Sequence, residues 1–389
     1  MARAKRDTVP ITPPRAYTLR ELAAQPGLVV WCLTLILTPF YVVDSGLPQP
    51  GDALVILLLP LALARWDGRF DPSTGRMLRT LLWFTAWVFV VNFAWAFVQW
   101  SWSNPKNFVI HPLFYIYNAA VLISALILAR PNPARFVRLT VDVTLLMVLF
   151  QVVASFFYKT ELYRGTLFFN SPNQLGYYCL LAAVLFAMTQ QPLGLSRVRA
   201  ALGVTGCAYL AVLSSSRASL AGILVLLLVL VFSNPRAVII GSLIAVGLTM
   251  LGGPLSDALE ASQQRALTDR APEVSFAEER GYERIWEYPE YLLLGAGEGD
   301  YGRFAKEGQS PREIHSSLGT VVFGYGVIGV ALFSLFAFRM VRGGTLRTSI
   351  MMIPAVTYTV AHQGLRFTSF WVVIGAYIML KQAAARPPP

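Results

Sequence analysis

The chain has 389 residues, of which 55% are hydrophobic and only 14% are charged, and its formal net charge is +11. Soluble domains usually contain about 25% charged residues, and disordered chains are poor in apolar residues, so this composition excludes both classes. It predicts an all-α protein, a polytopic bundle of transmembrane helices.

Twelve apolar stretches, separated by charged or Pro/Gly-rich breaks, are candidate membrane spans. A bilayer core of about 30 Å needs roughly 20 apolar residues per helix, and fewer where the helix ends are interfacial. The stretches cover about residues 28–43, 47–64, 78–100, 108–129, 136–158, 175–190, 198–213, 219–232, 237–252, 318–340, 348–361 and 367–381. The predicted organisation is an N-terminal tail (1–27), spans one to nine (28–252), a large loop (253–317), spans ten to twelve (318–381) and a C-terminal tail (382–389).

The distribution of Lys and Arg predicts the orientation of these spans. The segment 1–27 is basic and has no apolar region typical of a signal peptide, so we expect it to be a cytoplasmic tail. Alternation from there puts 20 of the 32 Lys and Arg on cytoplasmic segments and 12 outside, seven of them in the large loop. Long loops do not count toward the positive-inside rule. The remaining ratio of 20 to 5 predicts that both chain ends are cytoplasmic.

The large loop 253–317 is acidic, with 13 of the 21 Asp and Glu against seven basic residues. The rest of the chain therefore has 25 basic and 8 acidic residues, a balance that predicts contact with anionic membrane lipid and not with nucleic acid. The three cysteines and three histidines have no disulfide or metal-ligand spacing, so neither a metal nor another cofactor is expected.

The first of four polar clusters precedes the sixth span. It contains Arg164 and the stretch Phe169–Gly176, which includes Asn173. Asn and Ser favour helix N-caps, so one interpretation is a cap. In the other, the same helix start binds an anion through its amide groups and its positive dipole end.

The second cluster is the stretch Ser214–Ser219 between two apolar runs, and it includes Arg217. An arginine beside a helix end often extends only to the membrane interface. The alternative is that its guanidinium binds two phosphate oxygens and keeps its charge in a medium of low dielectric. The residues alone leave both interpretations open.

The third cluster lies in the large loop and contains Arg280 and Arg284, followed by the glycine-rich stretch 295–302. As charges alone, its Glu and Arg residues are typical of a solvated helix with ion pairs along its surface. The glycine run lacks the preceding strand and following Lys-Ser of a phosphate loop, so nucleotide binding is not predicted.

The fourth cluster, Glu313–Gly319, directly precedes the tenth span and contains His315; His362 and Arg366 lie between the last two spans. A lone interfacial histidine is more often a structural polar residue than a catalyst. Histidine is nevertheless the residue type whose unperturbed pKa, about 6.5, suits proton transfer near neutrality. The predicted orientation puts all four clusters on the outer side of the membrane.

Taken in order, these clusters resemble the O-antigen ligase and Wzy-type polymerase family, integral-membrane glycosyltransferases of bacterial surface polysaccharide assembly. The resemblance rests on the motifs Phe-Asn-Ser-Pro-Asn-Gln-Leu-Gly (169–176), Ser-Arg-Ala-Ser (216–219), Arg-Ile-Trp (284–286), Gly-Ala-Gly-Glu-Gly (295–299), His-Ser-Ser-Leu (315–318) and Gly-Val-Ile-Gly (326–329). It covers about residues 165–335. The order and spacing of the motifs around one large loop are more specific than any single motif.

The resemblance implies about twelve helices with a large periplasmic loop in the bacterial inner membrane, and an active site that faces the periplasm. The implied reaction moves a glycan from undecaprenyl diphosphate onto an acceptor hydroxyl, on a glycan or on lipid A core, without a metal. It also implies a chain-length regulator as a partner. Arg217 is expected to hold the diphosphate and His315 to act as the base. Arg280 or Arg284 would assist, and Arg164, Asn173, His362 and Arg366 would line the substrate site.

Two departures from the family pattern leave roles open. Tyr282 stands where the family usually has the loop arginine, and Arg280 and Arg284 flank it. The family often has His-Asn-Ser where this chain has His315-Ser316-Ser317.

One choice within this function and two alternatives to it remain at this stage. Ligase and polymerase differ only in the acceptor, which the residues do not identify. The second is a transporter or lipid-glycan flippase, which commonly has charges at mid-membrane or inverted repeats. In this sequence Asp142 is the only acidic residue well inside a predicted span, and no repeat is visible. The third is a membrane scaffold that binds a partner through its acidic loop.

Overall fold

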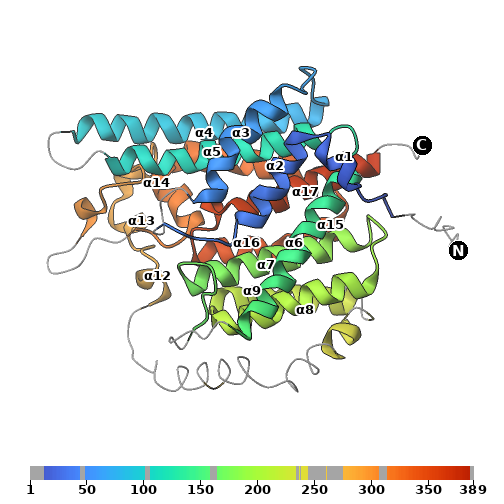
Figure 1. Ribbon diagram of the computed structural model, residues 1–389. Helices are drawn as coiled ribbons and strands as arrows, with labels where there is room; N and C mark the ends of the chain where they lie inside the picture. The colour runs from blue at the N-terminus through green and yellow to red at the C-terminus, as the bar shows by residue number, and fades with distance from the viewer. Residues whose placement is uncertain are drawn as a thin grey trace, which may run out of the picture.

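A computed structural model describes residues 13–43, 49–100, 106–157, 164–233, 236, 238–243, 260, 275–305 and 313–385, with side chains of the fifth helix from residue 108 on. These residues form a bundle of helices, and no strand occurs among them (Figure 1). The predicted all-α class is confirmed.

Five helices in the described residues are long and apolar enough to cross a membrane. They are α4 (Pro72–Val98), α5 (Lys106–Ala129), α6 (Pro133–Ser155), α14 (Ser317–Val341) and α17 (Thr368–Ala385). Shorter apolar helices pack among them: α2 (Pro26–Leu37), α3 (Pro50–Leu63) and α9 (Arg217–Ser233). The number of spans, predicted as about twelve, stays a prediction.

The helix α7 (Pro172–Gln190) lies at the centre of the bundle. It packs against α8 (Arg197–Ser214), α9 and α17, and its residues from Leu175 to Phe186 are all buried. A helix that is apolar all round is typical of such an interior position.

The predicted eleventh span, 348–361, is not one helix. The chain forms α15 (Leu346–Ile350), turns at Met351 and Met352, and begins again as α16 (Ile353–Ala361). Pro354 explains the restart, because proline fits the first turn of a helix but not its interior. Nine residues rise about 14 Å, roughly half of a hydrocarbon core. The predicted ninth span, 237–252, lies mostly outside the described residues.

The described part of the large loop folds back onto the bundle. It contains α12 (Phe276–Glu279), α13 (Arg284–Glu287), η1 (Pro289–Tyr291) and η2 (Tyr301–Phe304). The backbone of 292–297 is hydrogen-bonded to α14, with Ala296 N–H donating to Phe323 O at 2.9 Å and Val327 N–H donating to Leu292 O at 2.8 Å. This pairing needs an interruption of α14, which Gly326 supplies with φ +62°.

Two ends of the bundle can be distinguished in Figure 1. The end that carries α12 and α13 is called the loop end here. The opposite end carries α1 (Leu19–Ala23) and the last turn of α17, and is called the terminal end. The side of the membrane that each end faces stays a prediction.

Candidate functional site

The helix starts of α7, α9 and α14 lie at the loop end, and serine caps two of them. Ser171 Oγ accepts a hydrogen bond from Asn173 N–H at 3.2 Å, and Ser316 Oγ accepts one from Gly319 N–H at 3.0 Å. The cap of α7 is therefore Ser171, and Asn173 is free to use its side chain elsewhere. Capped N-termini also leave the positive ends of the helix dipoles at this end.

Gly176 lets the first turn of α7 approach the start of α9 closely. A Cβ at this position would lie 2.6 Å from Ser219 Oγ and 2.8 Å from Ser214 Oγ. Arg217 is the first residue of α9, and its side chain is exposed. The structure thus puts Arg217 in the turn that packs against the start of α7.

Arg164 joins the start of α7 to the end of α8. Its Nη2 donates to Asn173 Oδ1 at 3.0 Å and its Nε donates to Ser214 O at 3.1 Å. The Tyr358 hydroxyl, on α16, donates to Asn173 O at 3.1 Å. The predicted residues Arg164 and Asn173 therefore contact one another, and α16 lies beside them.

Arg280 connects the large loop to the end of α16. Its Nη1 donates to Ala361 O at 3.0 Å, and its own carbonyl accepts from His315 N–H at 3.0 Å. Its Nη2 pairs with Glu279 at 3.0 Å, and its buried Nε has no hydrogen-bond partner among the described residues. The side chain of His315 is 46% exposed, so it is open to a substrate.

His362 lies among these groups, at the C-terminal end of α16, where its ring stacks on Tyr358. Burial lowers the pKa of His362, and Arg280, His315 and Arg164 lower it further, to about 4. At neutral pH this imidazole is uncharged. Tyr358 links the ring of His362 to Asn173, and Arg280 contacts the carbonyl of Ala361, the residue before His362. We call Arg164, Arg280, His315 and His362 the basic cluster.

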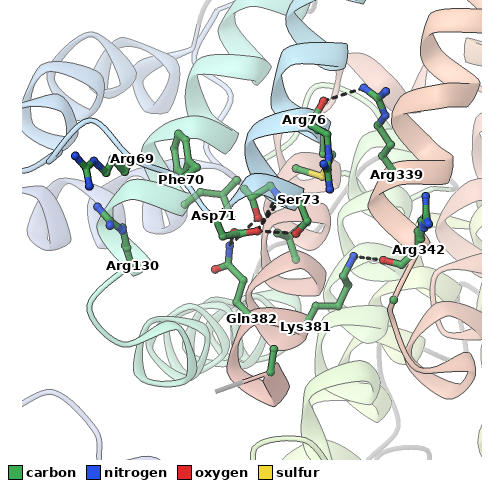
Figure 2. Close-up of a pocket in the computed structure, with 16 residues that line it drawn as sticks. Arg69, Phe70, Asp71, Ser73, Arg76, Arg130, Arg339, Arg342, Lys381 and Gln382 are labelled. Carbon is green, nitrogen blue, oxygen red and sulfur yellow. Dashed lines mark hydrogen bonds between the residues drawn. The ribbon is translucent and has the colours of Figure 1, made fainter. Parts of the chain in front are cut away.

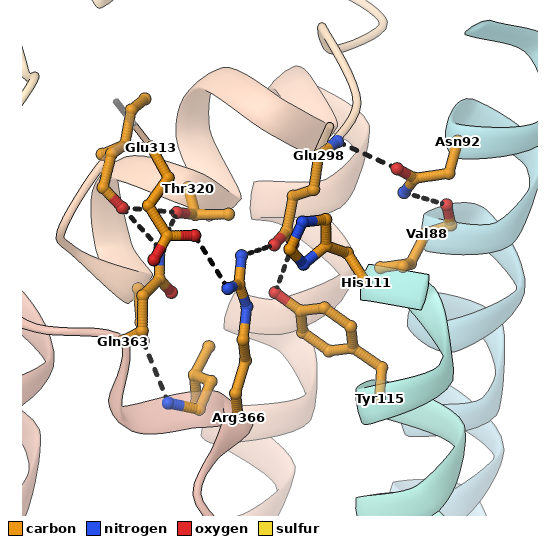
Figure 3. Close-up of polar contacts among 12 residues, drawn as sticks. Val88, Asn92, His111, Tyr115, Glu298, Glu313, Thr320, Gln363 and Arg366 are labelled. Atoms are coloured by element: carbon orange, nitrogen blue, oxygen red, sulfur yellow. Dashed lines mark hydrogen bonds and ion pairs between the residues drawn. The ribbon is translucent and has the colours of Figure 1, made fainter. Parts of the chain in front are cut away.

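A second polar group is centred on the buried side chain of Glu298 (Figure 3). The Arg366 guanidinium pairs with Glu298, whose side chain is 2% exposed, and with Glu313 at 2.9 Å. Glu298 also accepts hydrogen bonds from the hydroxyls of Tyr115, at 2.7 Å, and Tyr325. We call Glu298, Glu313 and Arg366 the buried triad.

The electrostatics of the buried triad favour its charged form. Burial raises the pKa of the Glu298 carboxyl, but the Arg366 guanidinium outweighs burial and holds that pKa below its ordinary value. The pKa of Glu313 is lowered by the same balance. The guanidinium of Arg366 is held by these two carboxylates, and its predicted place in the substrate site stays a prediction.

The two flanking loop arginines lie in different surroundings. Arg280 adjoins His315 and His362, as above. Arg284 is buried, its Cζ lies 5.6 Å from the centre of the Phe304 ring, and burial lowers its pKa. Tyr282, between them, places its hydroxyl 2.6 Å from Ser316 Oγ. The interpretation of this stretch as a solvated helix is therefore wrong for Arg284, and also for Glu298 further along the loop.

Glu313 joins the two groups, because its other carboxylate oxygen lies 3.9 Å from His315 Nδ1. The sequence reasoning assigned no role to Glu298 or Glu313. A signal for Glu313 was present, since an acidic residue two positions before a candidate base suits orientation of that base. Glu298 stands in a glycine run, which suggested only a loop.

No protein-family model matches this chain, and no curated protein matches it. The resemblance to the O-antigen ligase and polymerase family therefore rests on the sequence motifs alone. The expectations that no metal and no other cofactor take part stay predictions.

Proposed function

We propose that this protein is a membrane glycosyltransferase that moves a glycan from undecaprenyl diphosphate onto an acceptor hydroxyl. The observation that carries the proposal is the convergence of Arg164, Asn173, Arg280, His315 and His362 at one end of the bundle. These residues come from four separate motifs or segments. If each of these residues were only a helix cap or an interfacial residue, there would be no reason for them to lie at the same place.

The basic cluster suits a diphosphate leaving group. When the bond between the sugar C1 and the diphosphate oxygen breaks, the negative charge on the diphosphate increases. Fixed guanidinium groups stabilise that charge, and arginine binds phosphate oxygens in pairs. We assign this role to Arg217, Arg164 and Arg280. Arg280 is preferred over Arg284 because its Nε has no partner among the described residues and it adjoins His315.

His315 is the proposed base. Its imidazole accepts the proton of the acceptor hydroxyl while the acceptor oxygen forms the new bond to the sugar C1. Glu313, 3.9 Å from Nδ1, orients the ring and stabilises the imidazolium that forms. His362, uncharged beside the guanidinium groups, offers a hydrogen bond to the substrate.

The finer features of the proposal follow the family resemblance. They are about twelve spans, the bacterial inner membrane, a periplasmic active site in contact with loop 253–317, and a chain-length regulator as a partner. The acceptor is a glycan or lipid A core, so the protein is an O-antigen ligase or an O-antigen or exopolysaccharide polymerase. Membrane lipid surrounds the bundle.

The test uses the purified full chain in liposomes with undecaprenyl-diphosphate-linked glycan and an acceptor glycolipid. We expect release of undecaprenyl diphosphate together with extended acceptor. Arg280→Gln and His315→Gln should each reduce the rate about 100- to 1000-fold. Glu279→Gln is the matched control, because Glu279 contacts Arg280 but is 60% exposed; it should keep most of the activity.

Full activity in both Arg280→Gln and His315→Gln, with unchanged melting temperatures, would reject the site. Movement of labelled lipid-linked glycan between leaflets without any transfer would instead favour the flippase alternative.

A further inference from the structure

A second polar region lies at the terminal end, away from the basic cluster. It is an open cavity of about 1090 Å³ between the start of α4, the end of α5, the end of α14 and the last turns of α17 (Figure 2). Six of its lining residues are cationic: Arg69, Arg76, Arg130, Arg339, Arg342 and Lys381.

Acidic residues do not balance these cations. The cavity wall contains one acid, Asp71, so its formal charge is +5. Asp71 also serves as the cap of α4, where its Oδ1 accepts hydrogen bonds from the backbone of Ser73 and Thr74 at 3.0 Å each. Arg130 is paired outside the wall with Asp67. Counting this pair as neutral leaves a charge of +4.

Two of the cationic side chains in the wall are held by hydrogen bonds to backbone carbonyl groups. Lys381 Nζ donates to Met340 O and to Arg342 O, each at 2.7 Å, and Arg339 donates to Arg76 O at 3.1 Å. These bonds fix two cations at the C-terminal end of α14, where the helix dipole favours positive charge.

The side chains of Arg69, Arg76 and Arg342 differ from these. Nothing in the described part of the chain forms a hydrogen bond or ion pair with their guanidinium groups. All three are exposed and line the same cavity. Positive charges that line one cavity repel one another, and a bound anion reduces this repulsion. Arginine side chains bind phosphate oxygens through two parallel hydrogen bonds.

The cavity wall also has an apolar part. It is formed by Phe70, Met77, Leu126 and Ile378, while Ser73, Thr74 and Gln382 add neutral polar groups. A ligand that combines a phosphate with an apolar portion would therefore satisfy both parts of the wall.

We propose that this cavity is a binding site for a phosphate-bearing anion. An anionic phospholipid headgroup and a soluble organic phosphate share this chemistry. The site is separate from the proposed glycosyl transfer. Its occupant would join α4, α5, α14 and α17, and so stabilise the bundle.

The experiment uses the full chain, purified and delipidated in an uncharged detergent. Its melting temperature is followed during titration with short-chain phosphatidylglycerol, short-chain phosphatidylcholine or glycerol 3-phosphate. We expect saturable stabilisation by phosphatidylglycerol and little by phosphatidylcholine, which has no net charge. Equal stabilisation by glycerol 3-phosphate would identify a soluble phosphate as the ligand. If glycerol 3-phosphate does not stabilise the protein but phosphatidylglycerol does, the ligand is a lipid.

Two variants test the site itself. Arg76→Gln and Arg342→Gln should each weaken the binding at least tenfold. Both keep the backbone carbonyls that accept from Arg339 and Lys381. Arg79→Gln is the matched control: Arg79 is exposed on the same helix, three residues from Arg76, but does not line the cavity. Absence of saturable stabilisation by any anionic ligand, or equal weakening in Arg79→Gln, would overturn the proposal.

Discussion

Glu298 and Arg366 form an ion pair that no local sequence pattern predicts. They are 68 positions apart, and one stands in a glycine run and the other in a short loop before the last span. The residues of the basic cluster could be identified as candidates from sequence motifs, because histidine and arginine beside apolar spans are unusual. The pairing of a carboxylate with a particular guanidinium depends on the packing of α4, α5 and α14, which residue spacing does not contain.

The depressed pKa of His362 predicts a loss of stability in acid. The unfolded histidine has a pKa of about 6.5, whereas the folded one has a pKa of about 4. Between these values the unfolded state binds the proton first, so the stability present above pH 6.5 falls as the pH is lowered toward 4.

The measurement is the melting temperature of the wild type and of His362→Gln at pH 7 and at pH 4.5. The wild type should lose more between the two pH values, because the variant has no titratable group at position 362 and the other titratable groups are the same in both proteins. Equal losses in the two proteins would contradict the assigned pKa.

At the scale of elements, the interruption of α14 is the feature that admits the large loop. Gly326 has φ +62°, and a Cβ there would lie 2.6 Å from Leu293 O. The sequence reasoning noted the glycines of this span but treated the span as continuous. It also treated 348–361 as one span, although Pro354 favoured a helix start inside it. Both spans are predicted as continuous because apolar composition does not change at Gly326 or at Pro354, where the helices are interrupted.

Substitution at two glycines compares a crowded position with an open one. Gly326 and Gly343 both have positive φ, but nothing lies within 4 Å of a Cβ at Gly343. Gly343→Ala should cost only about 1–2 kcal/mol of backbone strain. Gly326 has φ +62° and ψ −166°, a conformation that is nearly exclusive to glycine, and a Cβ there would also displace 292–297. Gly326→Ala should therefore lower the melting temperature more and expose this stretch to protease. Similar melting temperatures and protease maps for the two variants would contradict the pairing of the loop with α14.

The whole molecule has a polar region at each end of the bundle. The basic cluster occupies the loop end, and the cationic cavity occupies the terminal end. Composition alone was sufficient for the helical class, since 55% hydrophobic residues with few charges leave little else. The number of spans could not be read in the same way, because short apolar helices such as α2, α3 and α9 have the composition of a span without its length.

Labelling of single cysteines tests the predicted orientation. In a background without Cys32, Cys179 and Cys207, Arg217→Cys and Arg342→Cys place a thiol at the loop end and the terminal end, where both side chains are exposed. In intact spheroplasts an impermeant maleimide should label the first variant, and the second only after lysis. Labelling of both from the same side would contradict the topology.

The buried triad has a consequence for biosynthesis. Glu298 and Glu313 leave the ribosome before Arg366, and until that arginine arrives the Glu298 carboxylate has no cation to accompany it into an apolar interior. An isolated buried charge is prohibitively costly, so docking of the stretch 292–299 has to wait for translation of the turn before the last helix. A nascent chain stalled ahead of residue 366 would therefore expose this stretch to quality-control proteases.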